Sequence, residues 1–80
     1  MPSDDQQLAA VQRHRWEVGR RIRTYRVGAG LSQVQLADRT GLDHRTISRA
    51  ENGVHATSID VIYRIAVGLG LPSWRLFHDE

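Results

Sequence analysis

Two short helices predicted within residues 32–53, SQVQLADRTGLDHRTISRAENG, constrain the fold more than any other part of the chain. The first begins after Ser32, because Ser32 and Gln35 form a capping box in which each side chain pairs with the other residue's amide. Gly41 suits the left-handed position that ends such a helix, and Asp43 can cap the next one. Because only three residues separate the helices, the chain must turn sharply between them.

The second of these helices, which ends at Gly53, presents two different faces. Ile47 and Ala50 fall on its inner face and anchor it to the core. The outer face carries only polar side chains, namely His44, Arg45, Ser48, Arg49 and Asn52. This arrangement is typical of a helix-turn-helix unit, whose second helix can enter the major groove of DNA.

The segment before this unit is also predicted to be helical. Apolar residues recur at steps of three, four and seven from Ser3 to about Val27, after a possible capping box at Ser3 and Gln6. Gly19 interrupts the pattern at a cost of about 1 kcal/mol relative to alanine. Residues 4–14 therefore form either the start of this helix or a separate, frayed turn.

The segment after the unit supplies two more predicted helices. Ser58 caps the fourth, which Gly70 stops, and Pro72 opens a short fifth helix. No segment alternates with the period of two that marks a strand. The chain is therefore predicted to be all-α, with five helices.

The composition narrows the function classes. The eighty residues are enough for one small domain. The absence of cysteine excludes disulfides, thiolate metal sites and cysteine nucleophiles. The four histidines are scattered without metal-ligand spacing, and no glycine-rich phosphate loop follows a strand. We expect no enzymatic activity, no metal and no other cofactor. No apolar run is long enough to span a membrane, and the first residues do not resemble a signal peptide, so we expect a cytoplasmic protein.

Positive charge is concentrated in residues 13–26, which carry six arginines and one acid, Glu17. The chain's net charge is only +2, so the remainder is net acidic. Arginine offers a planar fork that suits phosphates and guanine edges. Such a segment attracts a polyanion over long range and makes its binding sensitive to salt.

Two runs, LSQVQLADRTGLDHRTISRAENG and SIDVIYRIAVGLGLPSWRLF, resemble the Cro/repressor-type helix-turn-helix family, also called the xenobiotic-response-element family. The LSQxxLA opening, the TIS in the following helix and the closing ENG together carry the resemblance, which covers about residues 18–77. It implies a five-helix, lambda-repressor-like domain that binds operator DNA, commonly as a dimer on inverted repeats. We expect residues 15–80 to form this domain, and residues 1–14 to be an N-terminal extension or the start of helix 1.

The resemblance also implies roles for individual residues. Base contacts are expected from the exposed start of the third helix, here His44, Arg45, Thr46, Ser48 and Arg49. Arg45 and Arg49 lie four apart, and each fork can bond O6 and N7 of a guanine. Phosphate contacts are expected from Gln33, Asn52, Arg26 and Arg23. The arginines at positions 13, 15, 20 and 21 are expected to form a solvated face.

Arg26 and Glu51 match family positions that pair between the first and third helices. Both positions face inward, where an unpaired charge would be costly. We therefore expect an ion pair that is structural and also orients neighbouring DNA contacts.

Two features depart from the family's pattern. Ala50 is smaller than the residue usual at its inner position, which leaves space for Trp16, Tyr25 or Tyr63 to fill. Tyr63, Val67 and Trp74 are apolar where relatives tend to be polar. They form either a dimer patch or, for Trp74, a cover over the core.

We predict a sequence-specific, double-stranded DNA-binding transcriptional regulator that acts as a homodimer. The alternatives are an antitoxin or controller-type autoregulator with a protein partner, and a protein-interaction module on the same fold. The polar outer face of the third helix favours DNA. We expect no membrane association and no small-molecule effector.

Overall fold

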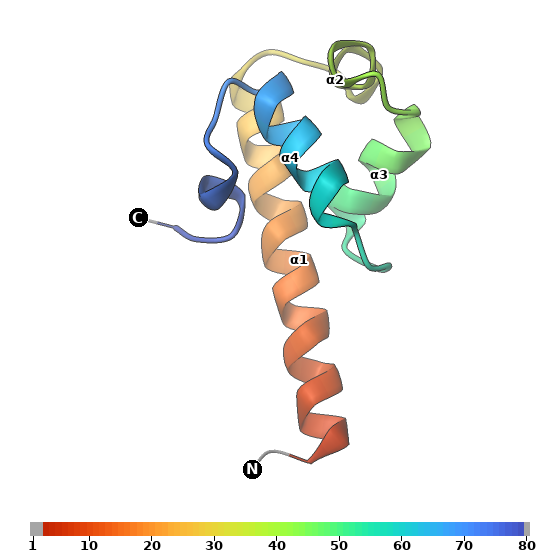
Figure 1. Cartoon of the computed structure of the whole chain (residues 1–80), viewed down its shortest axis with the longest axis vertical. Helices are drawn as coiled ribbons and strands as arrows, with labels where there is room; N and C mark the ends of the chain where they lie inside the picture. Colours follow the sequence, from red (N-terminus) through yellow and green to blue (C-terminus); the bar gives the residue numbers. More distant parts are fainter. Residues whose placement is uncertain (1–2, 80) are drawn as a thin grey trace.

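The computed structural model describes residues 3–79, which form four α-helices and one 3-10 turn. The elements are α1 (Asp4–Gly28), α2 (Gln33–Thr40), α3 (His44–Asn52), α4 (Ile59–Gly68) and η1 (Ser73–Leu76). The other elements gather around the C-terminal half of α1, while its N-terminal half extends away from them (Figure 1). This extension makes the molecule elongated, with principal extents of 41, 27 and 19 Å.

The prediction of five helices is wrong in its last element. The segment after Pro72 is a four-residue 3-10 turn, Ser73–Leu76, that no side chain caps. Runs of 3-10 structure rarely exceed three or four residues, because their hydrogen-bond geometry is poorer than that of an α-helix. The turn is held by burial of Leu76, which is fully inaccessible to solvent. Helix α4 also ends slightly earlier than predicted, at Gly68, with Gly70 in the left-handed region at φ +72°.

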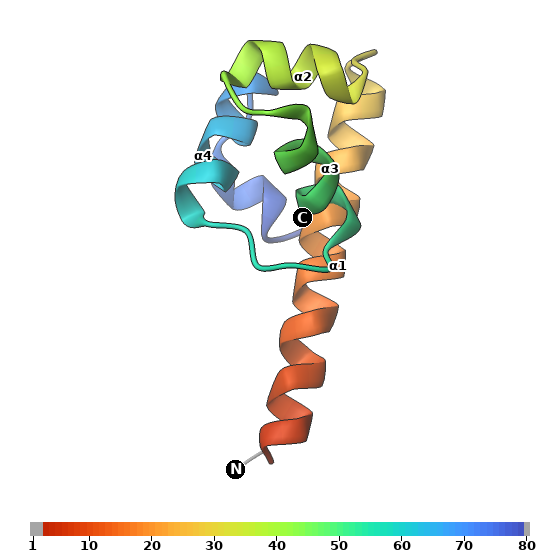
Figure 2. The ribbon, with the colours of Figure 1, turned by 90° about the vertical axis from the view of Figure 1, so that its right-hand side faces the viewer.

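The predicted caps around α2 and α3 are confirmed. Ser32 Oγ accepts from the amide of Gln35 at 3.0 Å, and Ser32 N donates to the Gln35 side chain at 2.8 Å. Gly41 adopts φ +70° at the end of α2, and Asp43 caps α3 through its side chain. These local signals set the sharp turn between the two helices, which is visible in a second view (Figure 2).

Helix α1 is continuous through Gly19, so residues 4–14 begin this helix and are not a separate turn. Gly19 is buried where α1 meets α3. A Cβ at this position would lie 2.6 Å from the carbonyl oxygen of Ala50 and closer still to that of Glu51. The glycine that the sequence marks as an interruption therefore permits backbone-to-backbone packing of the two helices.

The prediction that Trp16, Tyr25 or Tyr63 fills the space beside Ala50 is wrong, because none of them lines it. Trp16 is 55% exposed and Tyr63 61%, whereas Tyr25 is half-buried against the core. The close approach at Gly19 takes up part of the space. A small cavity of about 90 Å³ remains, lined by Ala50 and by residues of α1, the α3–α4 connection, α4 and the C-terminal segment.

The core joins all five elements around five fully buried large side chains, Ile22, Leu36, Ile47, Ile65 and Leu76. The expectation that Arg21 is solvated is wrong, since its side chain is only 9% exposed. Its Nε donates to Asp79 Oδ1 at 2.9 Å, and Nη1 donates to the carbonyl of Leu76 at 3.4 Å. Arg20, which remains exposed, also donates to Asp79 at 3.0 Å. These bonds tie the C-terminal segment to α1.

Candidate nucleic-acid interface

The outer face of α3 carries three exposed polar residues, Arg45, Arg49 and Asn52, at helical spacing i, i+4 and i+7. Ile47 is fully buried and Ala50 is 3% exposed on the opposite side, so α3 is held firmly against the core. Within residues 3–79, the guanidinium groups of Arg45 and Arg49 make no hydrogen bond or ion pair. Two forked donors are thus available to an external acceptor.

The other three residues predicted to read bases lie around this face. His44 is exposed at the first turn of α3, whereas Thr46 and Ser48 are half-buried on its two flanks. Thr46 and Arg49 border a surface hollow of about 370 Å³ between α3 and the start of α4. His44, Arg45 and Arg49 are therefore all exposed, but His44 lies on the side of α3 next to Ser48 and away from the two arginines, while Thr46 and Ser48 are partly covered.

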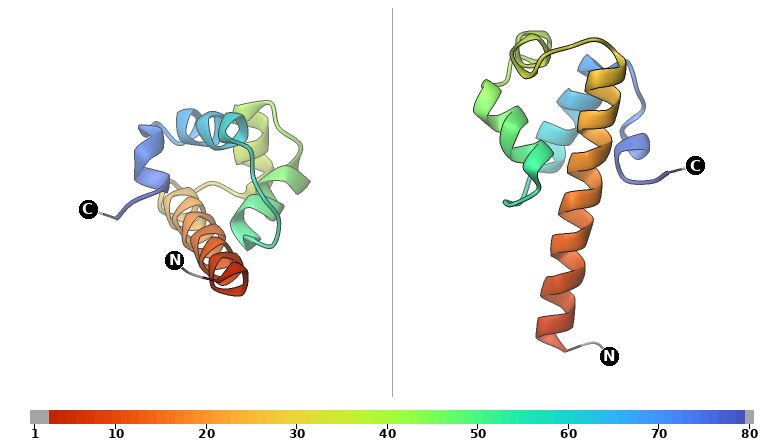
Figure 3. Two further views of the ribbon diagram at one scale, coloured as in Figure 1. Left: turned by 60° about the horizontal axis from the view of Figure 1, so that its bottom comes forward. Right: turned by 180° about the vertical axis from the view of Figure 1, so that it is seen from behind.

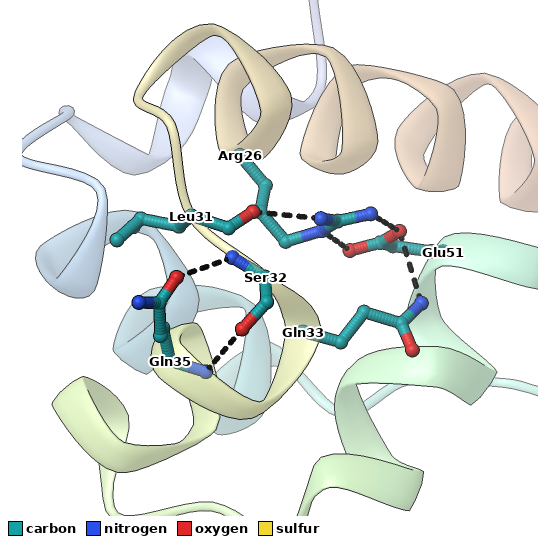
Figure 4. A network of polar contacts seen from close by, with 6 residues as sticks. All are labelled: Arg26, Leu31, Ser32, Gln33, Gln35 and Glu51. Atoms are coloured by element: carbon teal, nitrogen blue, oxygen red, sulfur yellow. Dashed lines mark hydrogen bonds and ion pairs between the residues drawn. The ribbon is translucent and has the colours of Figure 1, made fainter.

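Arg26 and Glu51 form a bidentate ion pair between α1 and α3 (Figure 4). Arg26 Nε donates to Glu51 Oε2 at 2.6 Å, and Nη2 donates to Oε1 at 3.0 Å. The side chains are 11% and 3% exposed, so the pair is largely removed from water. The hydrogen bond to Glu51 raises the pKa of Arg26, against the opposing effect of burial.

The ion pair belongs to a larger network that connects α1, α2 and α3. Arg26 Nη1 donates to the carbonyl of Leu31 at 2.8 Å, which holds the connection leading into α2. Gln33 Nε2 donates to Glu51 Oε1 at 3.3 Å from the first turn of α2. Figure 4 shows these side chains converging from the three helices. The network fixes the start of α2 relative to the end of α3, where Gln33 and Asn52 are the predicted phosphate contacts.

Sequence reasoning missed the contacts of Leu31 and Gln33 within this network. A main-chain carbonyl has no sequence signature, and the sequence predicts only a DNA contact for Gln33. All three nitrogens of the Arg26 guanidinium donate hydrogen bonds to oxygens of the protein. The Arg26 guanidinium is therefore engaged within the protein, where it connects α1 to the start of α2 and to the end of α3.

Arg23 and Asn52 are exposed. Arg23 lies one helical turn after Gly19, the residue at which α1 touches α3, so it is on the side of α1 next to α3. A view from behind shows α3 and α2 beside this part of α1 (Figure 3). Asn52 is thus accessible at the end of α3, and Arg23 is accessible on α1.

Tyr63 and Val67 on α4 and Trp74 on η1 are also exposed, and we call these three residues the α4–η1 patch. Their exposed fractions are 61%, 59% and 46%. Trp74 does not cover the core, and the guanidinium of Arg75 lies 5.3 Å from the centre of its ring. The alternative in which Trp74 folds over the core is therefore wrong.

The structure contains no grouping of three or more potential metal ligands among residues 3–79. None of the helices described is both long and apolar enough to cross a bilayer.

Comparison with known proteins places this arrangement in a family. A helix-turn-helix family model matches residues 22–73. A relative from Methanothermobacter thermautotrophicus, named an uncharacterized HTH-type transcriptional regulator, is 41% identical over 49 residues, which cover 61% of this chain and 71% of that one.

Two solved structures share the fold. The restriction-modification controller protein C.AhdI from Aeromonas hydrophila is 33% identical with a TM-score of 0.76, over 79% of this chain and 96% of that one. The hypothetical transcription factor NHTF from Neisseria is 29% identical with a TM-score of 0.77, over 81% of this chain and 75% of that one. The chain belongs to the Cro/repressor-type helix-turn-helix family of DNA-binding transcriptional regulators, which are not enzymes.

Proposed function

We propose that this regulator recognises a specific operator in double-stranded DNA by placing the outer face of α3 in the major groove. The observation that carries the proposal is the pair of exposed, unengaged guanidinium groups of Arg45 and Arg49 on a helix whose opposite side is fully buried. Each guanidinium can donate two hydrogen bonds to O6 and N7 of a guanine, and such a contact discriminates between bases when the helix that carries it is held rigidly. His44 reads a base beside them, with Thr46 and Ser48 at the edges of the footprint.

The phosphate contacts flank this face. Gln33 at the start of α2 and Asn52 at the end of α3 hold the backbone on either side, and Arg23 adds a charge from α1. The Arg26–Glu51 network supports the proposal because it fixes Gln33 and Asn52 relative to each other. These contacts position α3 without reading sequence.

The test is selection of bound sequences from random duplex DNA by the wild type and by Arg45→Ala and Arg49→Ala. Each variant is expected to relax the preference at one base pair, which costs about 1–3 kcal/mol of discrimination. Arg64→Ala is the matched control, because it removes the same charge from an exposed site on α4. Enrichment of no motif by the wild type would refute sequence-specific recognition, and an unchanged preference in both variants would reassign the arginines to phosphate.

We further propose that the protein binds an inverted repeat as a homodimer through the α4–η1 patch. Tyr63 and Val67 lie one turn apart on α4, and η1, which carries Trp74, packs against α4. Exposed aromatic and aliphatic side chains are typical of the cores of protein interfaces. In sedimentation, the wild type is expected to be a dimer and Trp74→Ala a monomer. Trp16→Ala, which removes a similarly exposed tryptophan, should remain a dimer. A Trp74→Ala variant that still sediments as the wild type would remove the patch from the proposal.

A second candidate function is that of a controller-type autoregulator. It is favoured by the similarity to C.AhdI, a restriction-modification controller protein, over 96% of that chain. Binding to the DNA upstream of the protein's own coding sequence, by the motif selected above, would support it. Absence of the motif there would refute autoregulation and indicate that the protein regulates other genes.

A further inference from the structure

The first part of α1 extends beyond the body of the protein as an uncovered arm, residues 4–11. The bond from Gln12 Nε2 to the carbonyl of Gly53, at 2.7 Å, marks the level at which α1 meets the body. Below it, the ribbon in Figures 1 and 2 shows α1 continuing alone. Leu8 is 67% exposed and Val11 47%. The arm precedes residues 22–73, which match the family model, so the DNA-binding role does not account for it.

One stripe of this helix has a self-complementary order of side chains. Asp4, Leu8, Val11 and Arg15 follow at steps of four, three and four, which places them on one face. The order is acidic, apolar, apolar, basic. Read from the opposite direction it becomes basic, apolar, apolar, acidic, so a second copy running antiparallel presents the complement at each position.

A two-fold axis midway along the stripe satisfies all four positions at once. Leu8 of each copy then faces Val11 of the other, and Asp4 of each copy faces Arg15 of the other. A parallel pair would instead oppose like charges at both ends, which is unfavourable. Such an isologous arrangement is the usual form of a homodimeric contact.

Asp4, Leu8 and Val11 are exposed, and Arg15, at the level where α1 meets the α3–α4 connection, is half-buried. Neither Asp4 nor Arg15 makes a side-chain hydrogen bond or ion pair with any part of the chain that the structure describes. Asp4, Leu8 and Val11, together with Gln7, line a surface hollow of about 380 Å³ on the same stripe. The first three residues of the stripe thus lie on one uncovered surface, and Arg15 continues the stripe at the edge of the body.

We propose that the arm is a self-association element that pairs antiparallel with the arm of a second copy of this chain. It is a surface separate from the α4–η1 patch and does not depend on DNA recognition. A stable dimer buries roughly 800 Å² on each partner, and about three turns of helix supply less. The contact therefore links copies that are already close, either side by side on DNA or at high concentration.

Disulfide trapping tests the register directly, because the chain has no cysteine of its own. In the full-length protein at high concentration, a mixture of Leu8→Cys and Val11→Cys is expected to cross-link about tenfold faster than either variant alone. Ala9→Cys mixed with Val11→Cys is the matched control, since Ala9 lies away from the stripe on the same arm. Faster cross-linking of each variant with itself would show parallel pairing and overturn the proposal, as would rates no higher than the control.

Charge reversal in the same cysteine-bearing proteins tests the complementarity. Asp4→Arg alone or Arg15→Asp alone places like charges at both ends of the pair, and cross-linking should slow by about fivefold to tenfold. Mixing the two variants puts opposite charges together again and should restore the wild-type rate. Helix content by circular dichroism is expected to stay unchanged, which separates lost pairing from lost folding. Failure of the mixture to recover would refute the antiparallel register, whatever the outcome for DNA binding.

Discussion

Removal of the Glu51 carboxylate is predicted to be among the most damaging single changes to this domain. The Arg26 side chain is only 11% exposed, so Glu51→Ala leaves a largely buried guanidinium without its ionic partner and also removes the acceptor of the Gln33 side-chain amide. Breaking a buried ion pair from one side costs about 3–5 kcal/mol. A chain of 80 residues has a free energy of unfolding of about 4–12 kcal/mol, so this change removes a large share of it.

The measurement is urea unfolding followed by circular dichroism, with thermal melting as a second readout. A loss of 3 kcal/mol corresponds to a fall in Tm of roughly 12 °C or more for a domain of this size. The double variant Arg26→Ala with Glu51→Ala should lose about 1–3 kcal/mol less than the sum of the single variants, because no charge is left unpaired. Arg20→Ala, which breaks an exposed pair, is the control and should cost less than about 1 kcal/mol.

DNA binding by Glu51→Ala should also weaken, when it is measured at a temperature where the variant is folded. Without the network, the start of α2 and the end of α3 are no longer fixed relative to each other, so the proposed phosphate contacts lose their common geometry. If Glu51→Ala lowers the free energy of unfolding by less than about 1 kcal/mol, the Arg26 guanidinium must become hydrated at little cost, and the argument from its burial would be refuted.

Two further predictions concern α1. Gly19→Ala should destabilise the domain by about 1–3 kcal/mol, because its Cβ would overlap the backbone of α3, and this cost outweighs the better helix propensity of alanine. Gly28→Ala is the control, since a Cβ there meets nothing within 4 Å, and it should leave the urea midpoint unchanged or higher. The bond from Arg21 lowers the pKa of the Asp79 carboxyl. The resulting stabilisation is present above the unfolded-state pKa of about 3.9 and is lost as the pH falls through the lower folded value. The melting temperatures of the wild type and Asp79→Asn should therefore converge as the pH falls through that range, and a constant difference would contradict the assignment.

The helix-turn-helix was predictable because its signals are local. A capping box, a left-handed glycine and a capping aspartate act within a few residues of one another, so the bounds of α2 and α3 follow from the sequence order alone. The inward positions of Ile47 and Ala50 follow from helical periodicity in the same way. The polar face of α3 is what remains once these residues are assigned.

The last element and the buried arginine were not predictable in this way. A short apolar pattern after Pro72 fits one turn of α-helix or of 3-10 helix equally well, and the choice depends on how Leu76 reaches the core. Arg21 is one of several similar arginines, and only the return of the C-terminal segment to α1 gives it Asp79 as a partner. Both depend on contacts between residues far apart in the sequence.

By itself, the sequence determined which segments are helices, where they are capped and which face of α3 is polar, because these properties depend on neighbours within one or two turns. Only the tertiary structure decided that Gly19 is a close contact between helices, that Arg26 is enclosed by Glu51, Leu31 and Gln33, and that the first part of α1 stands uncovered. The physical reason is that burial and pairing are set by whichever element packs opposite a residue, and no local pattern specifies that element.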